Sequence, residues 1–184
     1  MRQFLDGLYR VAEWAAMAAL CAIAVLVFAQ VSGRVFDTLL VMTGSSPYGF
    51  LIPSLAEIAG FLLVGASFLA LAGSFRAGSH IRVTLALMHL PEKVRRASET
   101  TALALAAFLS GLLAFYTARL AWDSFVYGEK SFGIIAVPLS LPQGVMALGA
   151  LVFAIATIDD LVATLRGGRP TSIAKEEEGA GDVA

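Results

Sequence analysis

The sequence predicts an all-α membrane protein with four transmembrane helices, cytoplasmic termini and a short amphipathic interfacial helix between the second and third spans. Of its 184 residues, 58% are hydrophobic and 15% are charged, and the mean hydropathy is +0.80. An average soluble domain has about 45–50% apolar and about 25% charged residues, so this composition indicates a membrane protein. Four apolar stretches are also long enough to cross a bilayer.

The four stretches define the predicted domain. Crossing about 30 Å of hydrocarbon with a rise of about 1.5 Å per residue takes about 20 mostly apolar residues. The first stretch exceeds the about 7–15 apolar residues of a signal peptide, so we expect it to be retained. Residues 1–166 should form the membrane domain, and 167–184, which lack periodic apolar residues, a disordered cytoplasmic tail. The predicted spans are Trp14 to Gly33, Leu55 to Phe75, Ala102 to Trp122 and Gln143 to Ala163.

The distribution of Lys and Arg predicts the orientation of the spans. Cations precede the first span, fill the segment between the second and third, and follow the fourth, whereas the opposite side carries Arg34 and Lys130. Short loops rich in positive charge stay in the cytoplasm. Both termini are therefore expected on the cytoplasmic side.

The segment 74–96 between the second and third spans is basic and half apolar. Ile81, Leu85 and Met88 fall on one helical stripe, which suits a helix lying in the interface with its apolar side in the acyl chains. Alternating apolar residues would also suit a strand, but a strand edge at the membrane lacks hydrogen-bond partners. We therefore expect a helix whose cations contact anionic lipid headgroups. These cations are Arg76, Arg82, Lys93, Arg95 and Arg96.

Three ionisable residues, Glu57, Arg119 and Arg34, fall near the outer ends of the predicted spans. Counting outward along the helices places Glu57 at about 29 Å and Arg119 at about 32 Å from the inner side, so they lie at similar heights. We hypothesise that Glu57 pairs with Arg119 or Arg34. The alternative is that the three side chains extend separately to water.

Other residues argue against chemistry inside the chain. Cys21 is the one cysteine, so neither an intrachain disulfide nor a multi-cysteine metal site is expected. His80 and His89 share one loop, whereas haem ligation in a bundle uses facing helices, so we expect no cofactor and assign His80 to orienting the turn. Asp159 and Asp160 should end the fourth span at the inner interface, too shallow for an ion relay. The net charge of −1 leaves no cationic face for nucleic acid, and we expect no enzymatic activity.

Several motifs together resemble a known family. They are R-V-F at 34–36, a glutamate opening the second span, R-A-G-S-H-I-R-V at 76–83, L-P at 90–91, and G-E-K-S-F-G-I-I-A-V-P-L-S-L-P at 128–142. Over roughly Gln30 to Leu161 the chain resembles the small, DctQ-type membrane subunit of tripartite ATP-independent periplasmic (TRAP) transporters. It departs from the family pattern at Ala56, where a second glutamate is frequent, and at Val35, where an aromatic is frequent.

The resemblance implies a membrane subunit that scaffolds a large multi-span permease subunit in the bacterial inner membrane. That pair takes up an organic acid, coupled to an ion, from a periplasmic solute-binding protein. The predicted structural or interaction residues are Arg34, Glu57, Arg76, His80, Arg82 and Arg119. Two alternatives stay open: a membrane anchor of a respiratory complex, with or without haem, and a small homo-oligomeric transporter.

Overall fold

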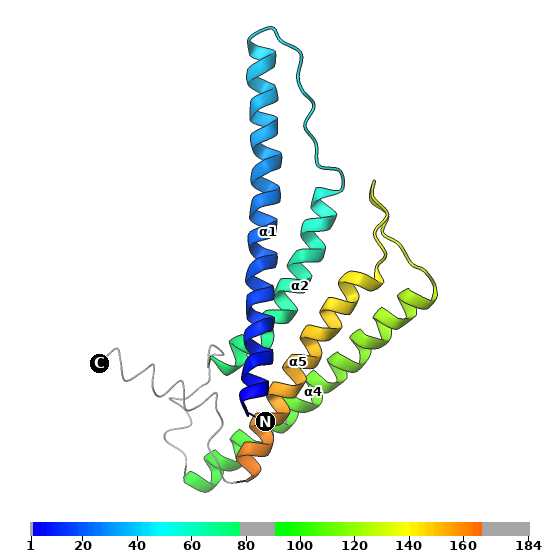
Figure 1. The fold of residues 1–184 in the computed structure, drawn as a ribbon. Coiled ribbons are helices and arrows are strands. Elements are labelled where there is room, and N and C mark those ends of the chain that lie inside the picture. Colours follow the sequence, from blue (N-terminus) through cyan, green and yellow to red (C-terminus); the bar gives the residue numbers. More distant parts are fainter. Residues whose placement is uncertain (1, 78–90, 167–184) are drawn as a thin grey trace, which may run out of the picture.

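A computed structural model describes residues 2–77 and 91–166 (Figure 1). Four α-helices make up most of these ranges, and each is long and apolar enough to cross a membrane, as predicted. The predicted interfacial helix, together with His80 and Arg82, lies outside the described residues. The helices are α1 (Arg2–Met42), α2 (Leu55–Arg76), α4 (Glu92–Val126) and α5 (Ser140–Leu165).

The helices continue beyond the predicted spans. The predicted spans contain the about 20 residues needed to cross the hydrocarbon, whereas a helix can continue past that length at either end. Thus α1 begins before Trp14 and continues past Gly33 to Met42. Pro91 precedes the first residue of α4 with φ −54°, which suits a helix start because proline fixes φ and lacks an N–H.

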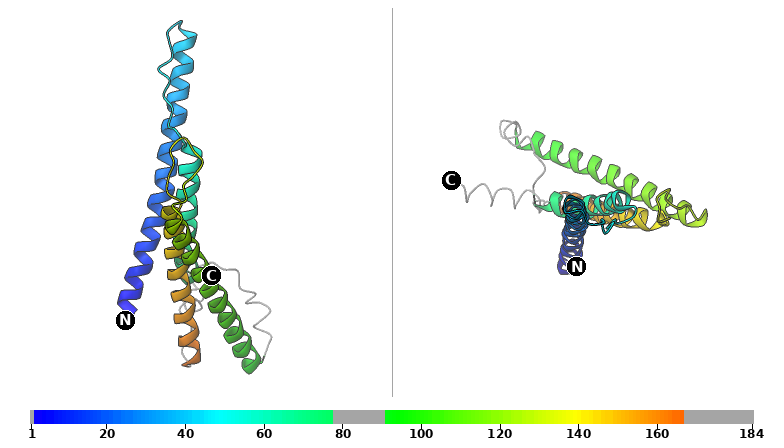
Figure 2. Two further views of the ribbon diagram at one scale, coloured as in Figure 1. Left: turned by 90° about the vertical axis from the view of Figure 1, so that its right-hand side faces the viewer. Right: turned by 90° about the horizontal axis from the view of Figure 1, so that it is seen from above.

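The four helices form an open row. Helix α1 packs against α2, α2 against α5, and α5 against α4, while α1 touches α5 only slightly. The views in Figures 1 and 2 show the same order, with α1 at one edge and α4 diverging at the other. Chain order and spatial order therefore differ, because the last helix lies between the second and third.

Small residues bring α2 and α5 close together at the centre of the row. A Cβ at Gly149 would lie 2.5 Å from the backbone carbonyl carbon of Phe68, and one at Gly65 would lie 3.1 Å from the Val145 side chain. Ala72 and Ala150 are fully buried. In lipid, where apolar burial gives little drive, such close van der Waals contact is a main source of helix association.

A hydrogen bond joins α4 to α5. The Ser110 and Thr157 hydroxyl oxygens are 2.8 Å apart, and both side chains are buried. The Thr157 hydroxyl also bonds to the Ala154 carbonyl oxygen at 2.9 Å within its own helix. The buried hydroxyls are thus satisfied, as an apolar environment requires.

Candidate functional site

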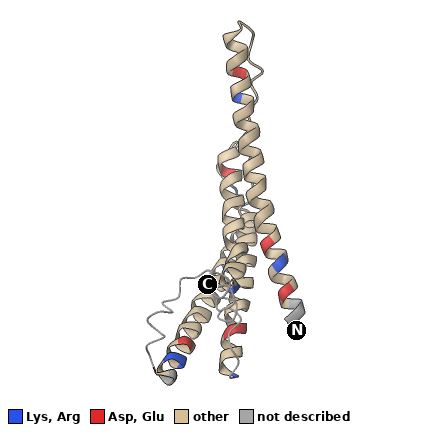
Figure 3. Ribbon diagram, turned by 90° about the vertical axis from the view of Figure 1, so that its left-hand side faces the viewer, with Lys and Arg blue, Asp and Glu red and all other residues tan. Residues whose placement is uncertain are grey.

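Charged residues gather at the two ends of the helix row. Figure 3 shows a long uncharged middle with acidic and basic residues toward the helix ends. The described ranges contain no group of three or more His, Cys, Asp or Glu residues able to hold a metal ion. Two groups of polar residues link different parts of the chain, one around Arg76 at the inner end and one around Glu57 at the outer end.

The inner cluster joins three helices around Arg76, the last residue of α2. Its guanidinium donates a 2.6 Å hydrogen bond to the Asp6 carboxylate of α1 and lies 4.5 Å from the centre of the Tyr9 ring. Tyr9 is buried, and it shares a hydrophobic cluster with Ala156 and Leu161 of α5. Because the cation meets both a carboxylate and an aromatic face, Arg76 fastens α2 to α1 at this end.

Asp160 belongs to the same end of the row. The sequence placed it at the inner end of the fourth span, and in the structure it lies near the end of α5, where it is also only 2% exposed. Its backbone carbonyl accepts a 2.8 Å hydrogen bond from the Thr164 hydroxyl. Asp160 shares a helix face with Val152 and Ala156, which are also buried. The spacing of four residues in the sequence could therefore have indicated that Asp160 faces the protein. The sequence did not predict a role for Asp6 or Tyr9. The two residues lie one helical turn apart on α1, so both can contact Arg76.

The outer cluster contains Glu57, in the first turn of α2. Its Oε2 is buried and has no hydrogen-bond partner among the described residues. Gly133 packs directly against this carboxylate, where a Cβ would collide with it. The neighbouring Ser54 hydroxyl accepts a 3.0 Å hydrogen bond from the Ile135 N–H. The segment between α4 and α5 therefore closes over the start of α2, and a carboxylate there complements the helix dipole.

Neither predicted ion pair of Glu57 is formed in the structure. Arg119 lies 3.8 Å from Asp123, one turn along α4, with its side chain 66% exposed. The row order explains this, because α5 separates α4 from α2. Gln30 of α1 lies level with Ile52, which precedes α2. Arg34 is exposed one turn farther out on α1, beyond the start of α2 where Glu57 lies.

A protruding outer arm consists of α1 residues 31–42 and the returning segment 43–54 (Figure 1). The Asp37 carboxylate accepts the Tyr48 and Gly49 N–H groups at 2.7 and 3.0 Å. Gly33 leaves room for the Phe50 ring, which a Cβ would strike. The sequence predicted a first span ending at Gly33, and so neither the helical extension to Met42 nor the return of the chain along α1.

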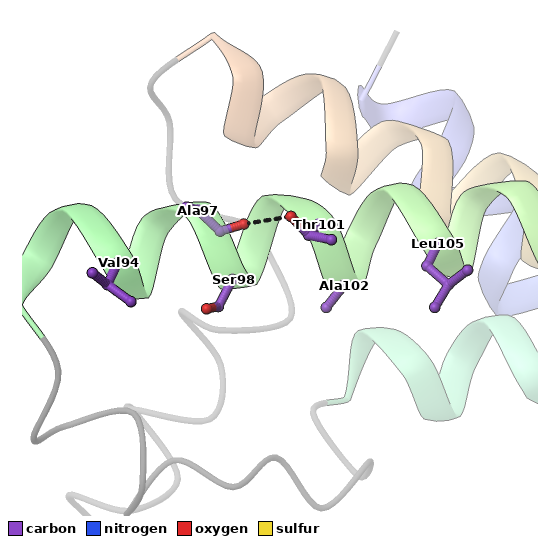
Figure 4. Close-up of a pocket in the computed structure, with 6 residues that line it drawn as sticks. All are labelled: Val94, Ala97, Ser98, Thr101, Ala102 and Leu105. Atoms are coloured by element: carbon purple, nitrogen blue, oxygen red, sulfur yellow. Dashed lines mark hydrogen bonds between the residues drawn. The ribbon is translucent and has the colours of Figure 1, made fainter.

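A shallow depression lies on the inner part of α4 (Figure 4). All of its lining residues come from this one helix, and the hydrogen bond there, from the Thr101 hydroxyl to the Ala97 carbonyl at 2.9 Å, is internal to the helix. A ligand site normally encloses its ligand from several sides, so a depression lined by one helix does not have the form of a ligand site. The lining residues are Val94, Ala97, Ser98, Thr101, Ala102 and Leu105.

Four apolar helices in an open row indicate a multi-pass membrane protein. The family model for the DctQ component of tripartite ATP-independent periplasmic transporters matches residues 23–167. The chain therefore belongs to the DctQ family and is a membrane subunit of a TRAP transporter, as its motifs indicated. This finding gives no support to a respiratory anchor or a stand-alone transporter. No curated protein matches the chain.

Proposed function

We propose that this chain scaffolds the large multi-span permease subunit of a TRAP transporter during ion-coupled uptake of an organic acid. A periplasmic solute-binding protein delivers the acid to the pair. Membership of the family supports association with both proteins in general. The observation that carries the scaffold role is the open row, in which apolar helix faces remain exposed among the described residues.

The interior of the described row supports a role without substrate binding. A carboxylate and its coupling ion need polar or charged partners near the bilayer midplane, and transporters often supply them from broken helices. Here the described helices run unbroken, and their charges cluster at the ends (Figure 3). The substrate and ion sites are therefore assigned to the large subunit, and this chain to a non-enzymatic role without a cofactor.

The proposed location is the bacterial inner membrane with both termini in the cytoplasm. The inner ends of α2 and α4 carry Arg76, Arg95 and Arg96, whereas the outer arm carries Arg34. By the positive-inside rule this charge distribution directs the outer arm to the periplasm. Arg34, Glu57, Arg76, His80, Arg82 and Arg119 keep their proposed structural or interaction roles, with Glu57 acting within the outer cluster.

Co-expression with a large TRAP permease subunit from the same genome tests the proposal. The two chains should purify together, and vesicles containing both should take up an organic acid when the binding protein and an ion gradient are supplied. Vesicles with either chain alone should show no such uptake. Uptake by this chain alone, or full uptake by the large subunit without it, would contradict the scaffold role.

A further inference from the structure

Helix α1 carries two stripes of residues at alternating spacings of three and four. One stripe, which includes the buried residues Tyr9, Ala12 and Ala16, faces the rest of the row. The opposite stripe runs from Trp14 to Met42 and is exposed at every position. Its large apolar members and their exposed fractions are Trp14 70%, Met17 47%, Phe28 74%, Val31 53%, Val35 55% and Met42 78%.

The spacing of the exposed stripe is that of a coiled-coil seam. Apolar residues that repeat every three and four positions insert between the side chains of a second helix running alongside. Sustained over about four heptads, this pattern indicates a long helical partner more than a loop or a small domain. Within the bilayer, lipid chains can also cover such a stripe, so the part outside the bilayer decides the matter.

The outer arm extends beyond the level at which α2 begins. The Gln30 side chain accepts a 2.7 Å hydrogen bond from the Ile52 N–H, which fixes that level on α1. The 12 residues 31–42 of α1 then rise about 18 Å farther. Helix α2, with 22 residues, is already about 33 Å long, enough to fill the hydrocarbon layer. The tip of the arm, at Met42, therefore lies beyond the hydrocarbon layer that α2 alone would fill.

We infer that a long helix of the large membrane subunit packs along the exposed stripe of α1, within the bilayer and beyond it along the outer arm. The inference rests on the proposed function. Permanent interfaces are more apolar than transient ones, and the stripe between Trp14 and Met42 carries no charge. A binding protein that docks and leaves would need a more polar surface. The Asp37 carboxylate, moreover, is already occupied by two backbone N–H groups of the arm.

Site-specific photo-cross-linking in the intact complex tests this inference. A benzophenone side chain replaces Val35 on the stripe or, as the matched control, Phe36, which is equally exposed at 57% but about 100° farther around the helix. The Val35 probe should give a several-fold stronger adduct with the large subunit than the Phe36 probe. Adducts with a second copy of this chain, with the binding protein or with lipid alone would overturn the inference.

Charge substitution gives a second readout. At equal amounts of folded chain, Val35→Asp should lower the co-purified large subunit about tenfold, the effect of losing a central interface contact. Phe36→Asp should lower it less than about twofold. Unchanged co-purification of Val35→Asp contradicts the inference but leaves the proposed function intact. Failure of the unmodified chain to hold the large subunit would defeat both.

Discussion

Helices α5 and α1 are nearly equally apolar, yet 39% of the most apolar 18 residues of α5 are buried within the molecule, against 6% for α1. The difference lies in the number of neighbouring helices, since α5 packs against both α2 and α4. Helix α5 presents Gly149 to α2 and Thr157 to α4, whereas α1 packs against α2 along one stripe. Hydropathy thus identifies a span but does not show whether that span lies at the centre or at the edge of the row.

The largest effect is expected from enlarging the centre of the row. Gly149→Val places a side chain against the backbone of α2, which cannot move aside as a flexible side chain would. We expect the free energy of unfolding to fall by about 3 kcal/mol, the upper range for overpacking. Thermal unfolding in detergent measures this. Gly111→Ala, which meets no atom within 4 Å, is the control, and an equal loss there would refute the explanation.

A smaller loss is expected at the inner end, where α1 is fastened. Arg76→Met removes the ion pair with Asp6 and the contact with Tyr9. Since the Asp6 side chain is 48% exposed, the loss should be about 1–2 kcal/mol. Arg95→Met, which breaks a 3.8 Å pair with Glu99 on one exposed helix face, should change unfolding by less than about 0.5 kcal/mol. Equal effects would show that the inner cluster does not join the helices.

The contact between α4 and α5 should respond more weakly still. Thr157→Val keeps the side-chain shape but removes the hydroxyl that meets Ser110. Hydrogen bonds between membrane helices contribute about 0.6 kcal/mol on average, so we expect a loss of about 1 kcal/mol or less in thermal unfolding. Thr101→Val, whose hydroxyl bonds within its own helix, should have a smaller effect. A larger effect of Thr101→Val than of Thr157→Val would contradict a stabilising role for the Ser110–Thr157 hydrogen bond.

The smallest global effect is expected on the outer arm. Asp37→Ala releases the Tyr48 and Gly49 N–H groups, so hydrogen exchange at these two amides should accelerate. The free energy of unfolding should change by less than about 0.5 kcal/mol, because the segment is exposed and far from α5. Unchanged exchange at both amides would mean that the carboxylate does not hold the segment.

The sequence was sufficient for the four helices able to span a membrane and for the family, because both depend on local features: runs of apolar residues and short motifs. It was not sufficient for the order of the row. Placing Glu57 and Arg119 at one height was reasonable, but height alone cannot show that α5 separates their helices. Asp6 escaped notice for a related reason, since its contact with Arg76 joins positions 70 residues apart.

The position of α5 has a consequence for biogenesis. During synthesis α1 and α2 can pair as soon as both have entered the membrane, whereas α4 finds its main neighbour, α5, only after nearly all of the chain has been made. Until then α4 would stand in the bilayer without its principal contact. Translation halted before Ser140 should therefore yield an α1–α2 hairpin and a separate third helix, a natural substrate for membrane quality control.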